Sequence, residues 1–195
     1  MTADIFAYHL GIVVRDLDAA CARYTEFLQV PRWHFTEVER EGLPTNPATA
    51  GAKGRQRIAF GRVPGATFEL IQPVEGKSVF SLYLQERGEG LQHLGVWTPD
   101  VQQAVRESVA KGGRVTHALL ADGVASVQLT PSSPPDAIVP QLGRLAYIDP
   151  GFGGFQIEFV GSSDPGRMRA LLGDDFDEII TMPPWHKPGA GGSAA

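Results

Sequence analysis

The sequence contains the same short string twice, and this repeat constrains the fold more than any other feature. His9-Leu10-Gly11-Ile12-Val13 is followed 84 residues later by His93-Leu94-Gly95-Val96-Trp97. Each copy leads to a glutamate inside an apolar run, Glu69 within residues 68–71 and Glu158 within residues 157–160. An internal repeat of this kind usually means that one supersecondary unit is built twice. The duplicated side chains, imidazole and carboxylate, are ones that bind metal ions.

Composition excludes several classes of protein. The chain has 195 residues, 43% of them hydrophobic and 20% charged, which is ordinary for a globular protein. A net charge of -5 argues against a nucleic-acid partner. The single cysteine, Cys21, excludes an intrachain disulfide and favours a reducing compartment. We find no signal-peptide pattern and no apolar run of membrane-spanning length, so we expect a cytoplasmic protein without a membrane partner.

The first half of the chain reads as a strand, a helix and three strands, which we assign to a module over residues 5–75. A strand over residues 7–14 places His9 and Gly11 on one face by alternation. Asp16 is a good N-cap for a helix over residues 17–28, whose apolar positions recur with helical spacing. Strands are then predicted at residues 33–38, 56–62 and 66–72, with a loop at 42–54.

The second half repeats this order over residues 91–161, after a linking helix within residues 76–90. A strand at 91–97 precedes a helix that Asp100 caps and Gly112-Gly113 ends. Strands follow near residues 114–119, 125–130, 145–148 and 155–160, with a surface excursion at 131–140. Residues 162–195 are assigned to a helix, ending near residue 172, and a disordered tail. The predicted fold class is α+β.

The repeated side chains favour a metal site. A carboxylate in an apolar strand costs free energy unless it is paired. Taken singly, each histidine or glutamate could be a hydrogen-bonded or solvent-facing residue, but their joint recurrence favours a shared role. If matching strands of the two units lie side by side, two imidazoles and two carboxylates converge. Such a set suits one divalent ion (Zn, Ni, Co, Mn or Fe) and leaves one or two positions open, as a catalytic site requires.

Several stretches are similar to those of methylmalonyl-CoA epimerases, namely residues 68–73, 86–93 and 153–158. Over residues 7–160 the chain resembles the vicinal oxygen chelate superfamily, which includes glyoxalase I, extradiol dioxygenases and bleomycin-resistance proteins, and it is closest to the epimerase branch. The resemblance implies two paired βαβββ modules that form a curved mixed sheet around a metal, with a short C-terminal helical extension. It also implies the ligand set His9, Glu69, His93 and Glu158.

The function that follows is a metal-dependent isomerase or lyase that abstracts a proton next to a carbonyl through a metal-stabilised enolate. Glu158 is the first choice for the residue that carries the proton and Glu69 the second. We expect a small-molecule carbonyl or thioester substrate and a homodimer. The alternatives are an extradiol-type dioxygenase and a non-catalytic, resistance-type binding protein. The sequence leaves open the metal, the substrate, and whether the modules pair within one chain or across a dimer.

Other polar residues have weaker assignments. Some epimerases carry an acid/base carboxylate on the strand before that of the second ligand, and the nearest match here is Arg57, which cannot act as a base. The cluster Lys53, Arg55, Arg57 and Arg62 could meet a substrate phosphate, although a solvated surface is the simpler interpretation. We assign the remaining groups as follows: His34 to a strand where it packs or lines the cavity, His117 and His186 to solvated positions near loops, Cys21 to the core, and residues 151–154 to a turn.

Overall fold

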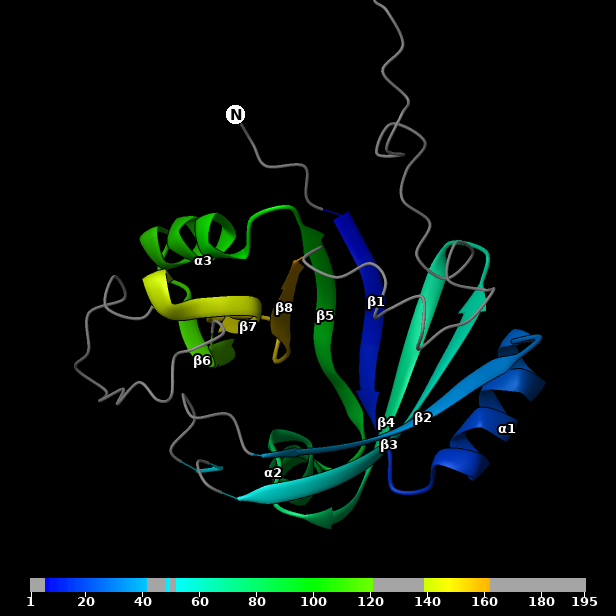
Figure 1. The fold of residues 1–195 in the computed structure, drawn as a ribbon. Coiled ribbons are helices and arrows are strands. Elements are labelled where there is room, and N and C mark those ends of the chain that lie inside the picture. Colours follow the sequence, from blue (N-terminus) through cyan, green and yellow to red (C-terminus); the bar gives the residue numbers. More distant parts are fainter. Residues whose placement is uncertain (1–5, 42–47, 50–51, 121–138, 162–195) are drawn as a thin grey trace, which may run out of the picture.

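The protein forms one mixed sheet of eight strands that curls into a half-barrel, with three α-helices packed against it (Figure 1). The computed structural model describes residues 6–41, 48–49, 52–120 and 139–161. In chain order the elements are β1 (Phe6–Val13), α1 (Leu17–Leu28), β2 (Trp33–Glu41), β3 (Lys53–Val63), β4 (Ala66–Gly76), α2 (Val79–Arg87), β5 (Gly90–Thr98), α3 (Val101–Ala110), β6 (Arg114–Leu120), the short 3-10 turn η1 (Val139–Gln141), β7 (Leu142–Asp149) and β8 (Gln156–Gly161).

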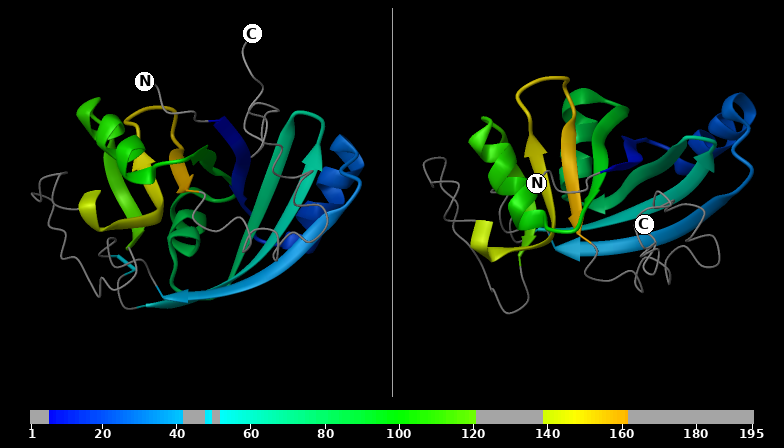
Figure 2. Two further views of the ribbon diagram at one scale, coloured as in Figure 1. Left: turned by 45° about the horizontal axis from the view of Figure 1, so that its top comes forward. Right: turned by 90° about the horizontal axis from the view of Figure 1, so that it is seen from above.

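The strand order β2-β3-β4-β1-β5-β8-β7-β6 divides the sheet into two similar halves. In each half the first strand pairs in parallel with the last, β1 with β4 and β5 with β8. The halves join where β1 runs antiparallel to β5, in the middle of the sheet (Figure 2). The two halves therefore pair within one chain, and the predicted α+β fold with two paired units in a curved mixed sheet is confirmed.

The predicted helices begin where their caps place them. Asp16 accepts a hydrogen bond from the backbone N–H of Ala19 at 3.0 Å, and Asp100 accepts one from that of Gln103 at 2.9 Å. In α2, the side chains of Ser78 and Ser81 each accept a hydrogen bond from the backbone N–H of the other. These bonds satisfy N–H groups that the first turn of a helix leaves without a partner.

Two apolar cores lie on the convex face of the sheet. Helix α1 buries Leu17 and Cys21 against Ala59 and Leu70 of β3 and β4. Helix α3 covers the other half, where its buried residues contact a cluster from β5 to β8 (Val96, Ala118, Ala146, Ile148 and Phe159). Because side chains alternate along a strand, the neighbours of these residues face the concave side. The core thus fixes which residues line the inside of the half-barrel.

Some expectations fall outside the described residues. They are the strand near residues 125–130, the excursion at 131–140 and the C-terminal extension over 162–195. The module bounds, the homodimer and the cytoplasmic location stay predictions. Within the described ranges, no helix is long and apolar enough to cross a membrane.

Candidate metal centre

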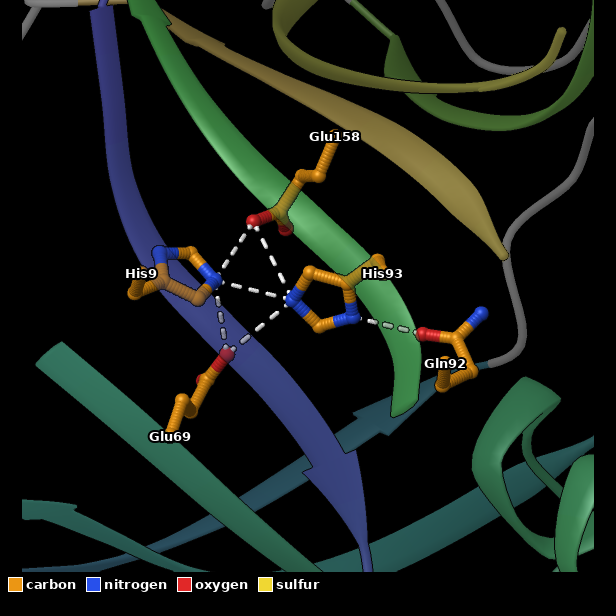
Figure 3. A network of polar contacts seen from close by, with 5 residues as sticks. All are labelled: His9, Glu69, Gln92, His93 and Glu158. Atoms are coloured by element: carbon orange, nitrogen blue, oxygen red, sulfur yellow. Dashed lines mark hydrogen bonds and ion pairs between the residues drawn. The ribbon is translucent and has the colours of Figure 1, made fainter. Parts of the chain in front are cut away.

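Four side chains from the four central strands meet on the concave face of the sheet (Figure 3). The Nε2 atoms of His9 and His93 are 2.8 Å apart. Oε2 of Glu69 lies 3.1 Å from the first of these nitrogens and 3.2 Å from the second. Oε2 of Glu158 lies 3.2 Å and 3.5 Å from the same two atoms. The structure therefore brings together all four residues that the sequence predicted as ligands.

The pairing of β1 with β5 explains why histidine and glycine recur together. His9 lies opposite Gly95, and Gly11 lies opposite His93. A Cβ atom added to Gly11 would lie 1.9 Å from the His93 ring, and one added to Gly95 would lie 2.1 Å from the His9 ring. Each imidazole thus occupies the space that a side chain would fill if the residue opposite it were not glycine. The His-Leu-Gly string recurs because the two rings can meet only if the residue opposite each of them is glycine.

The two glutamates lie on the strands that flank β1 and β5, at positions aligned with the histidines and glycines. Glu69 of β4 pairs with Gly11, and Glu158 of β8 pairs with Gly95. Paired residues on adjacent strands point to the same face of a sheet. Each carboxylate therefore lies beside a glycine whose missing side chain leaves room for it to reach the imidazoles.

A β-bulge fixes the orientation of the His93 ring. The register passes from Gly11 opposite His93 to Ile12 opposite Leu91, so Gln92 is the extra residue of β5. Gln92 is buried, and its Oε1 lies 2.6 Å from Nδ1 of His93. A carbonyl oxygen can only accept, so Nδ1 carries the proton and Nε2 presents its lone pair to the centre. Histidine ligands of metals commonly have a partner of this kind on the other ring nitrogen.

The charges of the four groups are strongly coupled. Burial alone would lower the pKa of His9, but Glu69 and Glu158 more than offset this effect and raise the pKa of His9 from 6.5 to about 9. Burial favours the neutral form of both glutamates, yet the two histidines hold their pKa values below the usual range. Without a metal, a proton on the His9 imidazole thus compensates part of the charge of the two buried carboxylates.

The arrangement suits a single metal ion. Nitrogen and carboxylate donors bind such an ion at about 2.0–2.2 Å, which places neighbouring donors about 2.8–3.6 Å apart. The separations between imidazole and carboxylate atoms here are 3.1–3.5 Å, and the two imidazole nitrogens are 2.8 Å apart. All four ligand atoms lie within 4.8 Å of one another. A divalent cation in their midst would replace the proton as the balancing charge.

Two residues of the basic cluster, Arg55 and Arg57, point away from this centre. Arg57 extends to α1, where its Nη1 and Nη2 atoms bind the Asp18 carboxylate at 3.0 Å and 2.9 Å. Arg55 bridges Glu37 and Glu75. On β3 the residues that share the face of Glu69 are Gln56, Ile58, Phe60 and Arg62, as the strand pairing shows. The part of β3 nearest the centre thus offers no additional carboxylate.

The predictions for the other histidines and for the cysteine differ in how well they agree with the structure. The interpretation of His117 as a solvated residue is wrong, because it is only 1% exposed on β6. His34 lies on the concave face of β2, opposite Phe60. Cys21 is buried as expected, and burial raises the pKa of its thiol to about 11, so it is a core residue rather than a nucleophile. Residues 151–154 form a turn, as predicted, and His186 lies outside the described residues.

Comparison with known proteins identifies one family and several solved structures with a similar fold. Residues 8–129 match the Glyoxalase/Bleomycin resistance protein/Dioxygenase superfamily. The fold is similar to methylmalonyl-CoA epimerase from Mycobacterium tuberculosis, with a TM-score of 0.53 and 26% identity over 83% of this chain and 91% of that one. Among curated proteins, none matches the sequence.

Two further solved structures share the fold. A methylmalonyl-CoA epimerase in complex with methylmalonyl-CoA and ammonium has a TM-score of 0.51 and 20% identity over 80% of this chain and 94% of that one. A mutant of 4-hydroxymandelate synthase from Streptomyces coelicolor has a TM-score of 0.52 and 16% identity over 84% of this chain and 40% of that one.

The steric role of the glycines predicts the effect of adding one methyl group. Gly11→Ala and Gly95→Ala should each displace the opposite imidazole and weaken the binding of Zn²⁺ or Co²⁺ by about 10–100-fold, as for other changes to the support of a ligand. Isothermal titration with each ion measures this change. Leu10→Ala, in the same string but on the opposite face, is the control, because it should lower stability without affecting ion affinity. Wild-type affinity in both glycine variants would contradict the proposed role.

The raised pKa of His9 predicts that metal binding releases a proton. At pH 7 the imidazole is protonated, since its pKa in the metal-free protein is about 9. A metal binds only the neutral ring, so the apparent affinity should rise about tenfold per pH unit up to about pH 9 and then level off. Calorimetry in buffers of different ionisation enthalpy should report about one proton released at pH 7. A pH-independent affinity between 7 and 9 would be inconsistent with this charge assignment.

Proposed function

Since this chain belongs to the glyoxalase/bleomycin resistance protein/dioxygenase superfamily, we propose that it is a metal-dependent isomerase or lyase that removes a proton next to a carbonyl group. The observation that carries this proposal is the convergence of His9, Glu69, His93 and Glu158 on one point, with both halves of the sheet contributing an imidazole and a carboxylate. The likeness to methylmalonyl-CoA epimerases supports an acyl-CoA thioester as the substrate class.

The four side chains would hold one divalent ion, and the ion would supply Lewis acidity toward the substrate carbonyl. The chain itself provides the conditions for proton transfer. The half-barrel surrounds the centre with buried groups, and His9, His93 and Glu158 are each no more than 5% exposed. Exclusion of water strengthens the electrostatic interactions at the reacting atoms.

Glu158 is our first candidate for the group that takes and returns the proton. Its Oε2 atom makes the longer contacts with the imidazoles, 3.2 Å and 3.5 Å, against 3.1 Å and 3.2 Å for Glu69. The carboxylate that is held less closely can turn toward a substrate with the smaller loss of interaction. The histidines keep the pKa of Glu158 low, so the carboxylate is ionised and able to accept a proton. Glu69 is the second candidate.

The geometry favours this class over the two alternatives. An extradiol-type iron site uses two histidines and one carboxylate, which leaves three positions for substrate and oxygen. Here a second carboxylate, Glu69, lies even closer to the imidazoles than Glu158 does. A binding protein without chemistry needs no buried cluster of four ligands, and burying their charges is costly.

Metal analysis separates these classes. The isolated protein should contain about one equivalent of Zn, Ni, Co or Mn per chain, measured by plasma mass spectrometry, because the four donors suit these ions. Oxygen-sensitive ferrous iron with oxygen uptake would favour the dioxygenase. The same preparation of a His9→Asn, His93→Asn variant is the control and should lose the metal.

Replacing Glu158 by glutamine tests the assignment of the base. Glu158→Gln should keep the bound metal, because the amide oxygen can still coordinate, but should slow the exchange of the substrate proton for solvent deuterium by about 10²–10⁴-fold. The exchange is followed by NMR with methylmalonyl-CoA. Glu75→Gln removes the same charge at an exposed position and should leave the exchange rate unchanged. Undiminished exchange in Glu158→Gln would transfer the role to Glu69 or refute the mechanism.

A further inference from the structure

His117 lies in the same register row as the candidate metal centre, at the edge of the sheet. It pairs with Tyr147 of β7, and Tyr147 pairs with Glu158 of β8. Glu158 pairs with Gly95 of β5, and Gly95 pairs with His9 of β1. The other half of the sheet contains the equivalent row of imidazole, aromatic ring, carboxylate, glycine and imidazole: His34, Phe60, Glu69, Gly11 and His93. His117 is therefore part of the duplicated interior and not an isolated core residue.

A β-bulge presents His117 in the same way as it presents the candidate ligand His93. The register of β6 passes from Val115 to His117 and leaves Thr116 as the extra residue. The Thr116 Oγ1 atom lies 2.9 Å from Nδ1 of His117, just as the bulged Gln92 contacts Nδ1 of His93. Bulges often occur beside active sites, where they redirect a side chain.

The contacts of Thr116 determine which ring nitrogen of His117 carries the proton. The hydroxyl also lies 3.2 Å from the backbone oxygen of Tyr147 and 3.1 Å from Oε1 of Gln156, and oxygens of both kinds accept hydrogen bonds. The single hydroxyl proton goes to one of them, so the imidazole N–H donates to Thr116 through Nδ1. Nε2 of His117 then carries a lone pair.

That lone pair is buried and has no hydrogen-bond partner in the described part of the chain. The ring stacks on Tyr147 with centroids 4.0 Å apart, and the edge of Tyr147 meets the His93 ring at 5.3 Å. Burial lowers the pKa of His117 to about 3, with a smaller opposing effect of Glu158 and a further lowering by His93, so the ring is neutral near pH 7. Phenylalanine would fill this stack without the cost of about 1–3 kcal/mol for an unsatisfied buried polar group.

We propose that Nε2 of His117 accepts a hydrogen bond from an N–H or O–H group of the substrate, remote from its reacting carbon. The inference rests on the proposed function for the place of the reacting carbonyl. His117 is two strands away from Glu158, or about 10 Å. A donor that reaches it must lie several bonds from the carbonyl. This requirement favours thioesters with an amide in the thiol arm over small hydroxyketones.

Two thioesters that differ in this amide test the proposal. Propionyl N-acetylcysteamine thioester has an N–H in the arm, and propionyl S-ethyl thioester has none. In long-range ¹H–¹⁵N NMR spectra of the Zn²⁺-loaded protein, the Nε2 resonance of His117 should shift when the first compound saturates the site and stay unchanged with the second. An unchanged resonance with both bound compounds would overturn the proposal, and failure of both compounds to bind would overturn it together with the proposed function.

The variants His117→Phe and His117→Gln separate recognition from folding. His117→Phe should keep the metal content and at least the wild-type Tm, because it retains the stack and removes the unsatisfied nitrogen. It should weaken binding of the amide-bearing thioester by about tenfold and leave that of the S-ethyl compound unchanged, whereas His117→Gln should restore part of the loss. Equal binding of both compounds by wild type and His117→Phe would refute the proposal. Binding and a resonance shift without deuterium exchange would refute only the proposed reaction.

Discussion

The close approach of two imidazole rings across β1 and β5 is the constraint on which the rest of the structure depends. Each ring occupies the space above a glycine of the other strand, so the two strands must be adjacent, antiparallel and in this register. A shift of one residue would place the two histidines on opposite faces of the sheet, where their rings could not meet. Because β1 and β5 open the two halves of the chain, this one contact also fixes how the halves join. The site is thus a consequence of the central pairing of the fold rather than an addition to it.

The same contact explains the electrostatic design. Two carboxylates buried beside two imidazoles require a positive charge, which the metal-free protein supplies by protonating His9 and a divalent ion would supply by coordination. The convex cores under α1 and α3 hold the flanking strands in place, so the carboxylates cannot move away from each other. The apolar packing on one face therefore maintains a charged cluster on the other, which would be unfavourable for an isolated hairpin.

The sequence predicted much of this arrangement because its strongest signals are local or repeated. Asp16 and Asp100 mark the starts of α1 and α3, and the spacing of the two His-Leu-Gly strings reveals which strands correspond. The prediction was wrong for His117, because the face of a side chain depends on exact register and on bulges. Thr116 adds one residue to β6 and brings His117 to the concave face, and no local pattern in the sequence indicates such an insertion.

The two halves agree at the centre and differ toward the edges of the sheet. The inner residues of the two rows are identical in kind, with glutamate, glycine and histidine in each. Further out, Phe60 corresponds to Tyr147, and the partly buried His34 corresponds to the buried His117. A reaction that uses both carboxylates needs the symmetric centre, whereas a substrate is asymmetric and must be held in one orientation. The divergence between β2–β3 and β6–β7 supplies that asymmetry, with the Phe60 ring on one side and the Tyr147 ring with its hydroxyl on the other. Specificity in this molecule is therefore expected to reside in the outer strands and reactivity in the duplicated core.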